Sequence, residues 1–158
     1  MIQFTKHSGI YLLRAETHIP VSLDNAWEFF SSPQNLVKIT PSTMGFQITS
    51  DSTPDVYAGK IITYKVSPFP GVKMNWVTEI TQVRENEFFV DEQRFGPYSM
   101  WHHEHHFEER DNGTFMVDLV YYKPPMGAIG RLFESTLIRP RLRQIFKFRE
   151  ESLREIFG

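Results

Sequence analysis

The chain has 158 residues, of which 41% are hydrophobic and 15% aromatic, and its formal net charge is −2. This length and balance predict a single globular domain over residues 1–158 with its own core. The nearly neutral charge argues against a nucleic-acid partner, and the lack of cysteine excludes disulfides and thiolate sites. No apolar run approaches the roughly 20 residues that a membrane span needs, so we expect no stable membrane insertion and a cytoplasmic location.

The first part of the chain predicts one strand followed by two short helices. Residues 4–17 mix apolar and polar side chains in the manner of a strand. Ser22 is a suitable N-cap for a helix whose apolar residues recur at helical spacing. Ser32-Pro33 then suits the cap and first position of a second short helix, which we expect to run to about Ile39.

The middle of the chain predicts an antiparallel sheet. Apolar and polar residues alternate there with a period of two, over about six strands. The tripeptide Asp111-Asn112-Gly113 is a strong hairpin signal, because Asn and Gly tolerate positive φ. We therefore pair the strand over residues 98–109 with the strand over residues 114–122.

The final part of the chain returns to helical spacing. Its apolar stripe consists of Ile129, Leu132, Phe133, Leu137, Ile138, Leu142, Ile145, Phe146, Leu153 and Ile156. Pro140 lies within this stripe and predicts a bend, because proline removes a backbone donor. A meander of strands cannot cover its own apolar face, so we expect an α+β fold with the curved sheet around this long C-terminal helix. The gap between them is a typical place for a small molecule.

Several motifs resemble the START-like superfamily, also called SRPBCC or helix-grip. They are Gly96-Pro97-Tyr98, Trp101-x-His103-x-His105-x-Phe107, Gly113-Thr114 and Asp118-x-Val120-x-Tyr122. The nearer resemblance is to the bacterial ligand-binding or polyketide cyclase/dehydrase-like branch. It implies a helix-grip fold with two short helices after the first strand, and a small hydrophobic ligand between sheet and helix. It also implies a functional association with an NAD-dependent epimerase-like protein, because domains of this branch occur fused to one.

The predicted hairpin gathers two histidines and an aspartate on one face of the sheet. The alternation of side chains along each strand, together with the register set by the turn, places these residues on that face: Trp101, His103, His105, Phe107, Met116, Asp118, Val120 and Tyr122. The opposite face also carries apolar residues, so the family pattern decides that the first face is the inner one.

Three interpretations of these polar residues remain open. In the first, Asp118 fixes the tautomer of an imidazole beneath the ligand. In the second, His103 or His105, oriented by Asp118, is the general acid–base of a cyclase, dehydratase or isomerase. In the third, His103, His105 and Glu109 bind a metal as half of a cupin-like motif. Because no histidine follows His106 to complete that motif, we predict no metal and no other cofactor.

Binding of a small hydrophobic or amphipathic molecule, lipid- or polyketide-like, is the main functional prediction, and acid–base catalysis is the alternative. The residues expected around the ligand are Tyr64, Trp76, Trp101, His103, His105, Phe107, Asp118, Tyr122, Phe146 and Arg149. Asp91 and Gln93 also fall on inner positions, and we interpret them as a strand rim in water. Arg149 has three open roles: pairing with Asp118 or Asp91, gripping a ligand carboxylate, or extending its head into water.

Overall fold

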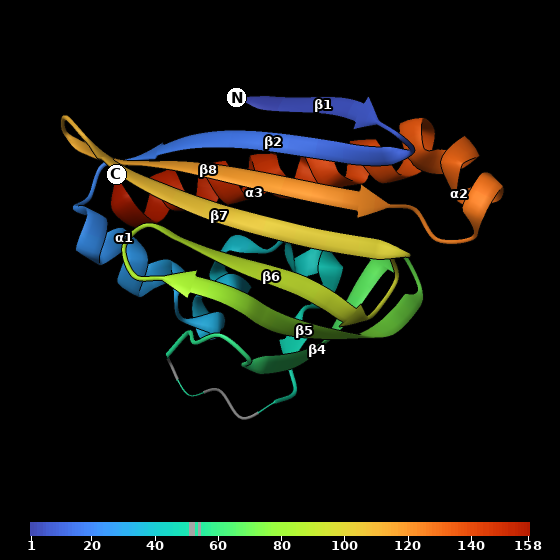
Figure 1. The fold of residues 1–158 in the computed structure, drawn as a ribbon, viewed down its shortest axis with the longest axis horizontal. Helices are drawn as coiled ribbons and strands as arrows, with labels where there is room; N and C mark the ends of the chain where they lie inside the picture. The colour runs from blue at the N-terminus through green and yellow to red at the C-terminus, as the bar shows by residue number, and fades with distance from the viewer. Residues whose placement is uncertain (51–52, 54) are drawn as a thin grey trace.

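A curved antiparallel sheet wraps around a long C-terminal helix in the computed structural model, which describes residues 1–50, 53 and 55–158 (Figure 1). The strands are β1 (Ile2–His7), β2 (Ile10–Ile19), β3 (Gln47–Ile48), β4 (Ile61–Phe69), β5 (Val72–Arg84), β6 (Phe88–Phe95), β7 (Met100–Arg110) and β8 (Gly113–Lys123). They form one sheet in the order β1-β2-β8-β7-β6-β5-β4-β3. The predicted helix-grip α+β fold is thereby confirmed.

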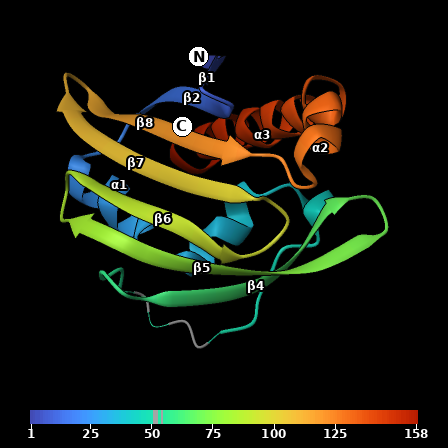
Figure 2. The ribbon, with the colours of Figure 1, turned by 45° about the vertical axis from the view of Figure 1, so that its right-hand side comes forward.

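The helical segments lie on the concave side of this sheet or at its end (Figure 2). They are α1 (Leu23–Phe30), the 3-10 helices η1 (Pro33–Ile39) and η2 (Ser42–Met44), α2 (Gly127–Phe133), the π-helical turn η3 (Glu134–Ile138) and α3 (Arg139–Phe157). Within the described residues, no helix combines the length and the apolar character that crossing a membrane requires.

The N-terminal segment forms two strands where the sequence predicts one. Ser8 and Gly9 adopt φ values of 49° and 80° and form a tight turn, so that His7 pairs with Ile10. Positive φ at both central residues suits a two-residue hairpin, because it matches the twist of the strands. Serine seldom adopts positive φ, which explains why the residue pattern hides this turn. The prediction of a single strand over residues 4–17 is wrong.

The two helices after β2 begin where the sequence predicts them. Ser22 Oγ accepts a hydrogen bond of 3.4 Å from the backbone N–H of Asn25 and so caps α1. Pro33 lies in the first turn of η1, which ends at Ile39. Phe30 and Ile39 are buried in one apolar cluster with residues of the sheet, so these helices close one end of the concave face.

The β7–β8 hairpin has the register that its turn predicts. Asn112 adopts a φ of 68°. Cα pairing sets Trp101 opposite Tyr122 and His105 opposite Asp118. Apart from half-buried Trp101, the residues assigned to the inner face are all buried, which confirms the choice of face.

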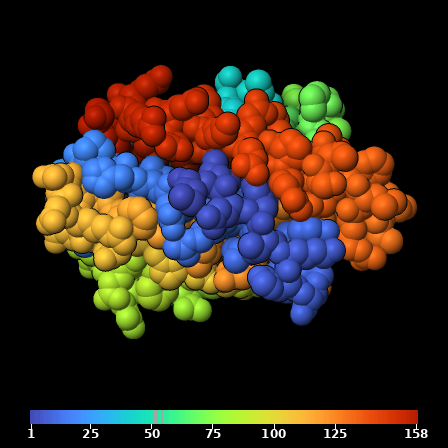
Figure 3. Space-filling view, turned by 90° about the horizontal axis from the view of Figure 1, so that it is seen from above, coloured from blue at the N-terminus to red at the C-terminus, as the bar shows by residue number. Residues whose placement is uncertain are grey.

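The C-terminal helical run is interrupted by η3, immediately before Pro140 in the first turn of α3. A π turn holds one extra residue, which rotates the helix that precedes it by about 100°. Ile129 and Leu132 are therefore exposed, whereas the buried apolar residues of this run are Ile138, Leu142, Phe146 and Leu153. The prediction of one continuous apolar stripe is wrong for its first turns and for Ile156, which is exposed near the end of α3. In Figure 3 the α2 segment, in orange, projects at one end of the molecule.

Candidate functional site

A pocket of about 160 Å³ lies between the concave face of the sheet and α3. Its size is close to that of a roughly 150 Å³ apolar cavity that admits benzene. Of the residues predicted around a ligand, those on the lining are Tyr64, Trp76, Trp101, His103, His105, Phe146 and Arg149. The other three predicted residues, Phe107, Asp118 and Tyr122, are outside the lining.

These three residues are buried behind the pocket wall, where each has another partner. The Phe107 ring lies against Trp27, with ring centroids 5.5 Å apart. Asp118 lies beneath the histidines and binds them. The Tyr122 hydroxyl donates a 2.7 Å hydrogen bond to Glu134, a buried carboxylate of η3.

Aromatic rings form one wall of the pocket. Tyr64 stacks on Trp76 with ring centroids 5.8 Å apart, and Trp101 meets Trp76 edge-on at 5.2 Å. The Tyr64 hydroxyl and the Thr78 hydroxyl share a 3.0 Å hydrogen bond. The indole N–H of Trp76 is buried and has no hydrogen-bond partner among the described residues. This wall therefore offers a large apolar surface with one free donor.

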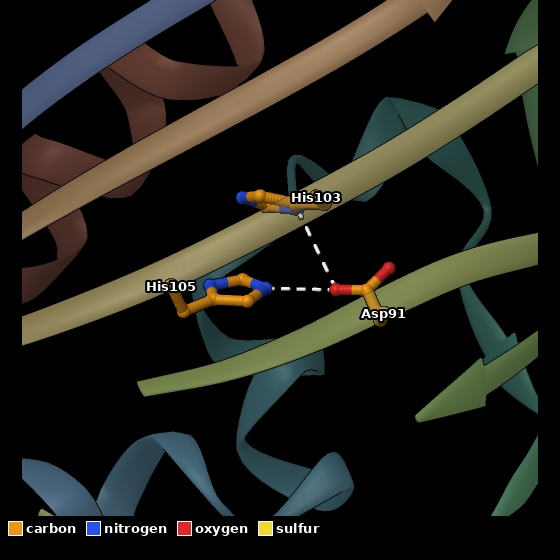
Figure 4. Close-up of side chains that lie close together, drawn as sticks. All are labelled: Asp91, His103 and His105. Carbon is orange, nitrogen blue, oxygen red and sulfur yellow. Dashed lines mark hydrogen bonds and ion pairs between the residues drawn. The ribbon is translucent and has the colours of Figure 1, made fainter. Parts of the chain in front are cut away.

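A cluster of two histidines and two aspartates forms the polar end of the pocket. Figure 4 shows His103 and His105, from β7, directed toward one carboxylate oxygen of Asp91, from the neighbouring strand β6. His105 Nε2 donates to Asp91 Oδ2 at 2.8 Å, and His103 Nδ1 lies 3.7 Å from the same oxygen. The two imidazole centroids are 3.7 Å apart. Strand pairing alone brings these residues together, because Asp91 is the Cα partner of His103.

Asp118 joins the two imidazoles from the other side. Its Oδ1 accepts a 2.8 Å hydrogen bond from His103 Nε2. His105 Nδ1 lies 3.0 Å from the same oxygen, but without the orientation of a hydrogen bond. The prediction that Asp118 holds an imidazole is therefore confirmed for His103. In this arrangement a neutral His103 carries its proton on Nε2 and a lone pair on Nδ1.

Arg149 completes the cluster from α3. It is buried, and its Nη1 donates to Asp118 Oδ1 at 3.3 Å. Its guanidinium carbon lies 4.8 Å from the centre of the Phe146 ring. Of the three roles considered for Arg149, pairing with Asp118 is the one found, and extension into water is wrong. Its Nε is buried without a hydrogen-bond partner in the described part of the chain.

Asp91 belongs to this site, and the interpretation of it as a rim in water is wrong. Its side chain is 15% exposed and lines the pocket. Gln93 is half-buried and closes the loop before β7 through hydrogen bonds with the backbone of Tyr98. The sequence signal for Asp91 is its alternation with Phe89, which stacks on His105 at 4.2 Å.

Burial and charge set the protonation of the cluster. Burial favours neutral Asp118, but the Arg149 guanidinium, the hydrogen bond from His103 and the nearby His105 outweigh it and hold the pKa of Asp118 well below its ordinary value. The pKa of Asp91 is lowered against burial in the same way, chiefly by its hydrogen bond from His105. Burial and the charge of His105 lower the pKa of His103. For His105, burial is outweighed by the nearby carboxylate of Asp118 and the hydrogen bond to Asp91, which together raise the pKa.

Two carboxylates therefore face one guanidinium and two imidazoles, and of these imidazoles His105 holds a second proton more readily than His103. On the opposite face of β7, His102 and His106 donate to Glu92 and Glu104 and take no part in the site.

Fold and site together define a helix-grip domain with a pocket beneath its C-terminal helix. Residues 19–146 match the family described as polyketide cyclase / dehydrase and lipid transport. The chain belongs to this family, which confirms the START-like resemblance. No curated protein matches the chain.

Solved structures share the fold at low sequence identity. Protein Ms6760 from Mycobacterium smegmatis is 16% identical with a TM-score of 0.68, over 99% of this chain and 98% of that one. TTHA0849 from Thermus thermophilus is 17% identical with a TM-score of 0.64, over 93% of this chain and 99% of that one. Major latex-like protein 151 from Panax ginseng is 15% identical with a TM-score of 0.61, over 91% of this chain and 97% of that one. Likeness at this level establishes the fold alone.

Proposed function

We propose that the protein binds one small, largely apolar molecule that carries a polar group, of lipid- or polyketide-like character. The observation that carries this proposal is a pocket with aromatic walls that ends in a buried cluster of imidazole, carboxylate and guanidinium groups. Ligand sites typically combine apolar walls with a few placed polar groups. The family description, which names polyketide cyclases and lipid transport, supports the same class of ligand.

Burying charged side chains costs free energy, and this cost supports a role for the cluster in contact with the ligand. Replacing a buried ionic cluster by apolar side chains of similar volume is often neutral or stabilising, so stability alone does not explain it. His103 and Arg149 line the pocket, and Arg149 Nε and Trp76 Nε1 have no partner among the described residues. A ligand oxygen would satisfy one of these buried donors, whose unpaired state costs about 1–3 kcal/mol.

The test is a fluorescence titration with 1-anilinonaphthalene-8-sulfonate, an apolar ring system with one anionic group. Val66 is buried and lines the pocket, and Val66→Phe fills part of the void. We expect this variant to weaken binding by at least about tenfold, or roughly 1.4 kcal/mol. Val72→Phe is the matched control, because Val72 is 45% exposed and outside the lining. Equal affinity in the two variants, each shown by circular dichroism to be folded, contradicts the proposal.

A second candidate function is general acid–base catalysis, for which the observation is the His103–Asp118 pair. Asp118 holds His103 Nε2 at 2.8 Å and leaves the lone pair of Nδ1 for a substrate proton. The substrate would be a carbonyl or polyketide-like compound of the kind that cyclases, dehydratases and isomerases use. Turnover of such a compound that is lost in His103→Gln, while ligand affinity is kept, would distinguish catalysis from binding.

A further inference from the structure

We infer that Asp91, His103 and His105 form a site for one divalent transition-metal ion at the polar end of the pocket. Their ligand atoms, one from each residue, all lie within 4.8 Å of one another. Two imidazoles and one carboxylate, arranged around a common point with open positions, are the ligand set of non-haem Fe²⁺ and of catalytic Zn²⁺ centres. The inference goes beyond ligand binding by the pocket and does not depend on it.

The distances suit a metal ion. Metal–ligand bonds of about 2.0–2.2 Å at angles of 90–110° separate the ligand atoms by roughly 3.0–3.5 Å. Asp91 Oδ2 lies 2.8 Å from His105 Nε2 and 3.7 Å from His103 Nδ1, which brackets this separation. Shifts of a few tenths of an ångström would bring these two separations into range.

The far nitrogens of both histidines meet one outer carboxylate. Asp118 Oδ1 lies 2.8 Å from His103 Nε2 and 3.0 Å from His105 Nδ1, the two nitrogens that would not bind the metal. Histidine ligands almost always contact a carboxylate, carbonyl or water through their second nitrogen, which fixes the ring and raises its basicity. Arg149 in turn holds Asp118. The outer-shell hydrogen bond is thus already formed for His103, and for His105 the same carboxylate lies within reach.

The charge of the cluster also favours a cation. With both imidazoles neutral, two carboxylates face one guanidinium, and one negative charge is left over. A divalent cation would therefore meet a net attractive charge at this end of the pocket. The three ligands all line the pocket, so the remaining coordination positions of the ion would face the space where a ligand binds.

The third ligand, Asp91, lies on β6, outside the His-x-His motif of β7. In the sequence, Glu109 is the carboxylate that a cupin-like motif would pair with the histidines, and no metal is predicted because the second half of that motif is missing. Glu109 is exposed near the end of the hairpin, whereas Asp91 reaches the histidines from β6. A metal on His103 Nδ1 would prevent that nitrogen from accepting a proton, so this site excludes the acid–base role of His103.

The test is a titration of the full chain with CoCl₂ after removal of bound metal by a chelator, followed by visible absorption. We expect one Co²⁺ per chain with ligand-field bands, and competition by ZnCl₂. Asp118→Asn should weaken binding about 10–100-fold, as loss of an outer-shell partner does. Asp91→Asn, which keeps the shape of the side chain, and His103→Gln should weaken it further. His106→Ala, on the outer face of the same strand, should leave the affinity unchanged.

The outcomes separate this inference from the proposed function. Absence of Co²⁺ binding by the wild-type chain overturns the inference, and so does equal affinity in wild type, Asp91→Asn and His106→Ala. Circular dichroism identifies any variant that fails to fold. If a variant does not fold, the stoichiometry and the spectrum of Co²⁺ bound to the wild-type chain still test the inference. A chain that binds the fluorophore but no Co²⁺ retains the ligand-binding function and loses the metal site.

Discussion

Removal of the Arg149 charge should destabilise the fold far more than removal of an exposed arginine from the same helix. Arg149→Met keeps an apolar stem against Phe146 but leaves Asp118, which is 1% exposed, without its guanidinium. Loss of one partner of a buried ion pair typically costs about 3–5 kcal/mol. The expected loss for Arg149→Met lies at the lower end of this range, because His103 still donates to Asp118.

Urea unfolding at neutral pH measures this loss as a lower midpoint at constant slope. The matched control is Arg154→Met, which removes an exposed pair with Glu150 whose contribution is about 0.3–0.5 kcal/mol. The double variant Arg149→Met/Asp118→Asn should be more stable than Arg149→Met alone, because it no longer buries an unpaired charge. A loss below about 1 kcal/mol for Arg149→Met, equal to that of the control, would show that the guanidinium does not stabilise buried Asp118.

Three further predictions concern other buried groups. Glu134→Gln should lower stability by about 1.5–3 kcal/mol in urea unfolding, because Tyr122 and Arg139 lose a charged acceptor. Because the folded-state pKa of Asp118 is lowered, its stabilisation is complete above the ordinary carboxyl pKa of 3.8 and is lost as the pH falls below it. The urea midpoint should therefore drop on acidification in wild type and drop less in Asp118→Asn; parallel curves would contradict this assignment. Gly130→Ala should lower the thermal midpoint, because its Cβ would collide with the carbonyl of Pro125, and an unchanged midpoint would show that α2 is free to shift.

The sequence predicts the β7–β8 half of the site well because that half depends on a local signal. The turn at Asp111-Asn112-Gly113 fixes the register, and the register alone sets His105 opposite Asp118. The position of Arg149 on the apolar stripe likewise indicates that it faces the sheet. These features need only short-range patterns and the alternation of side chains.

The other half of the site depends on contacts that short-range patterns do not encode. Asp91 meets the histidines through the β6–β7 register, and these strands are joined by residues 96–99 rather than by a recognisable two-residue turn. Glu134 is buried only because a π turn rotates the helix at that point, and helical periodicity alone places it elsewhere. The same rotation exposes Ile129 and Leu132, which the period assigns to the core.

Native mass spectrometry of the protein purified from its own cells weighs whatever occupies the pocket between the sheet and α3. We expect one small apolar molecule per chain in wild type and in Val72→Phe, and its loss in Val66→Phe. A bound mass of equal abundance in Val66→Phe and Val72→Phe would contradict the claim that the ligand lies between the sheet and the C-terminal helix.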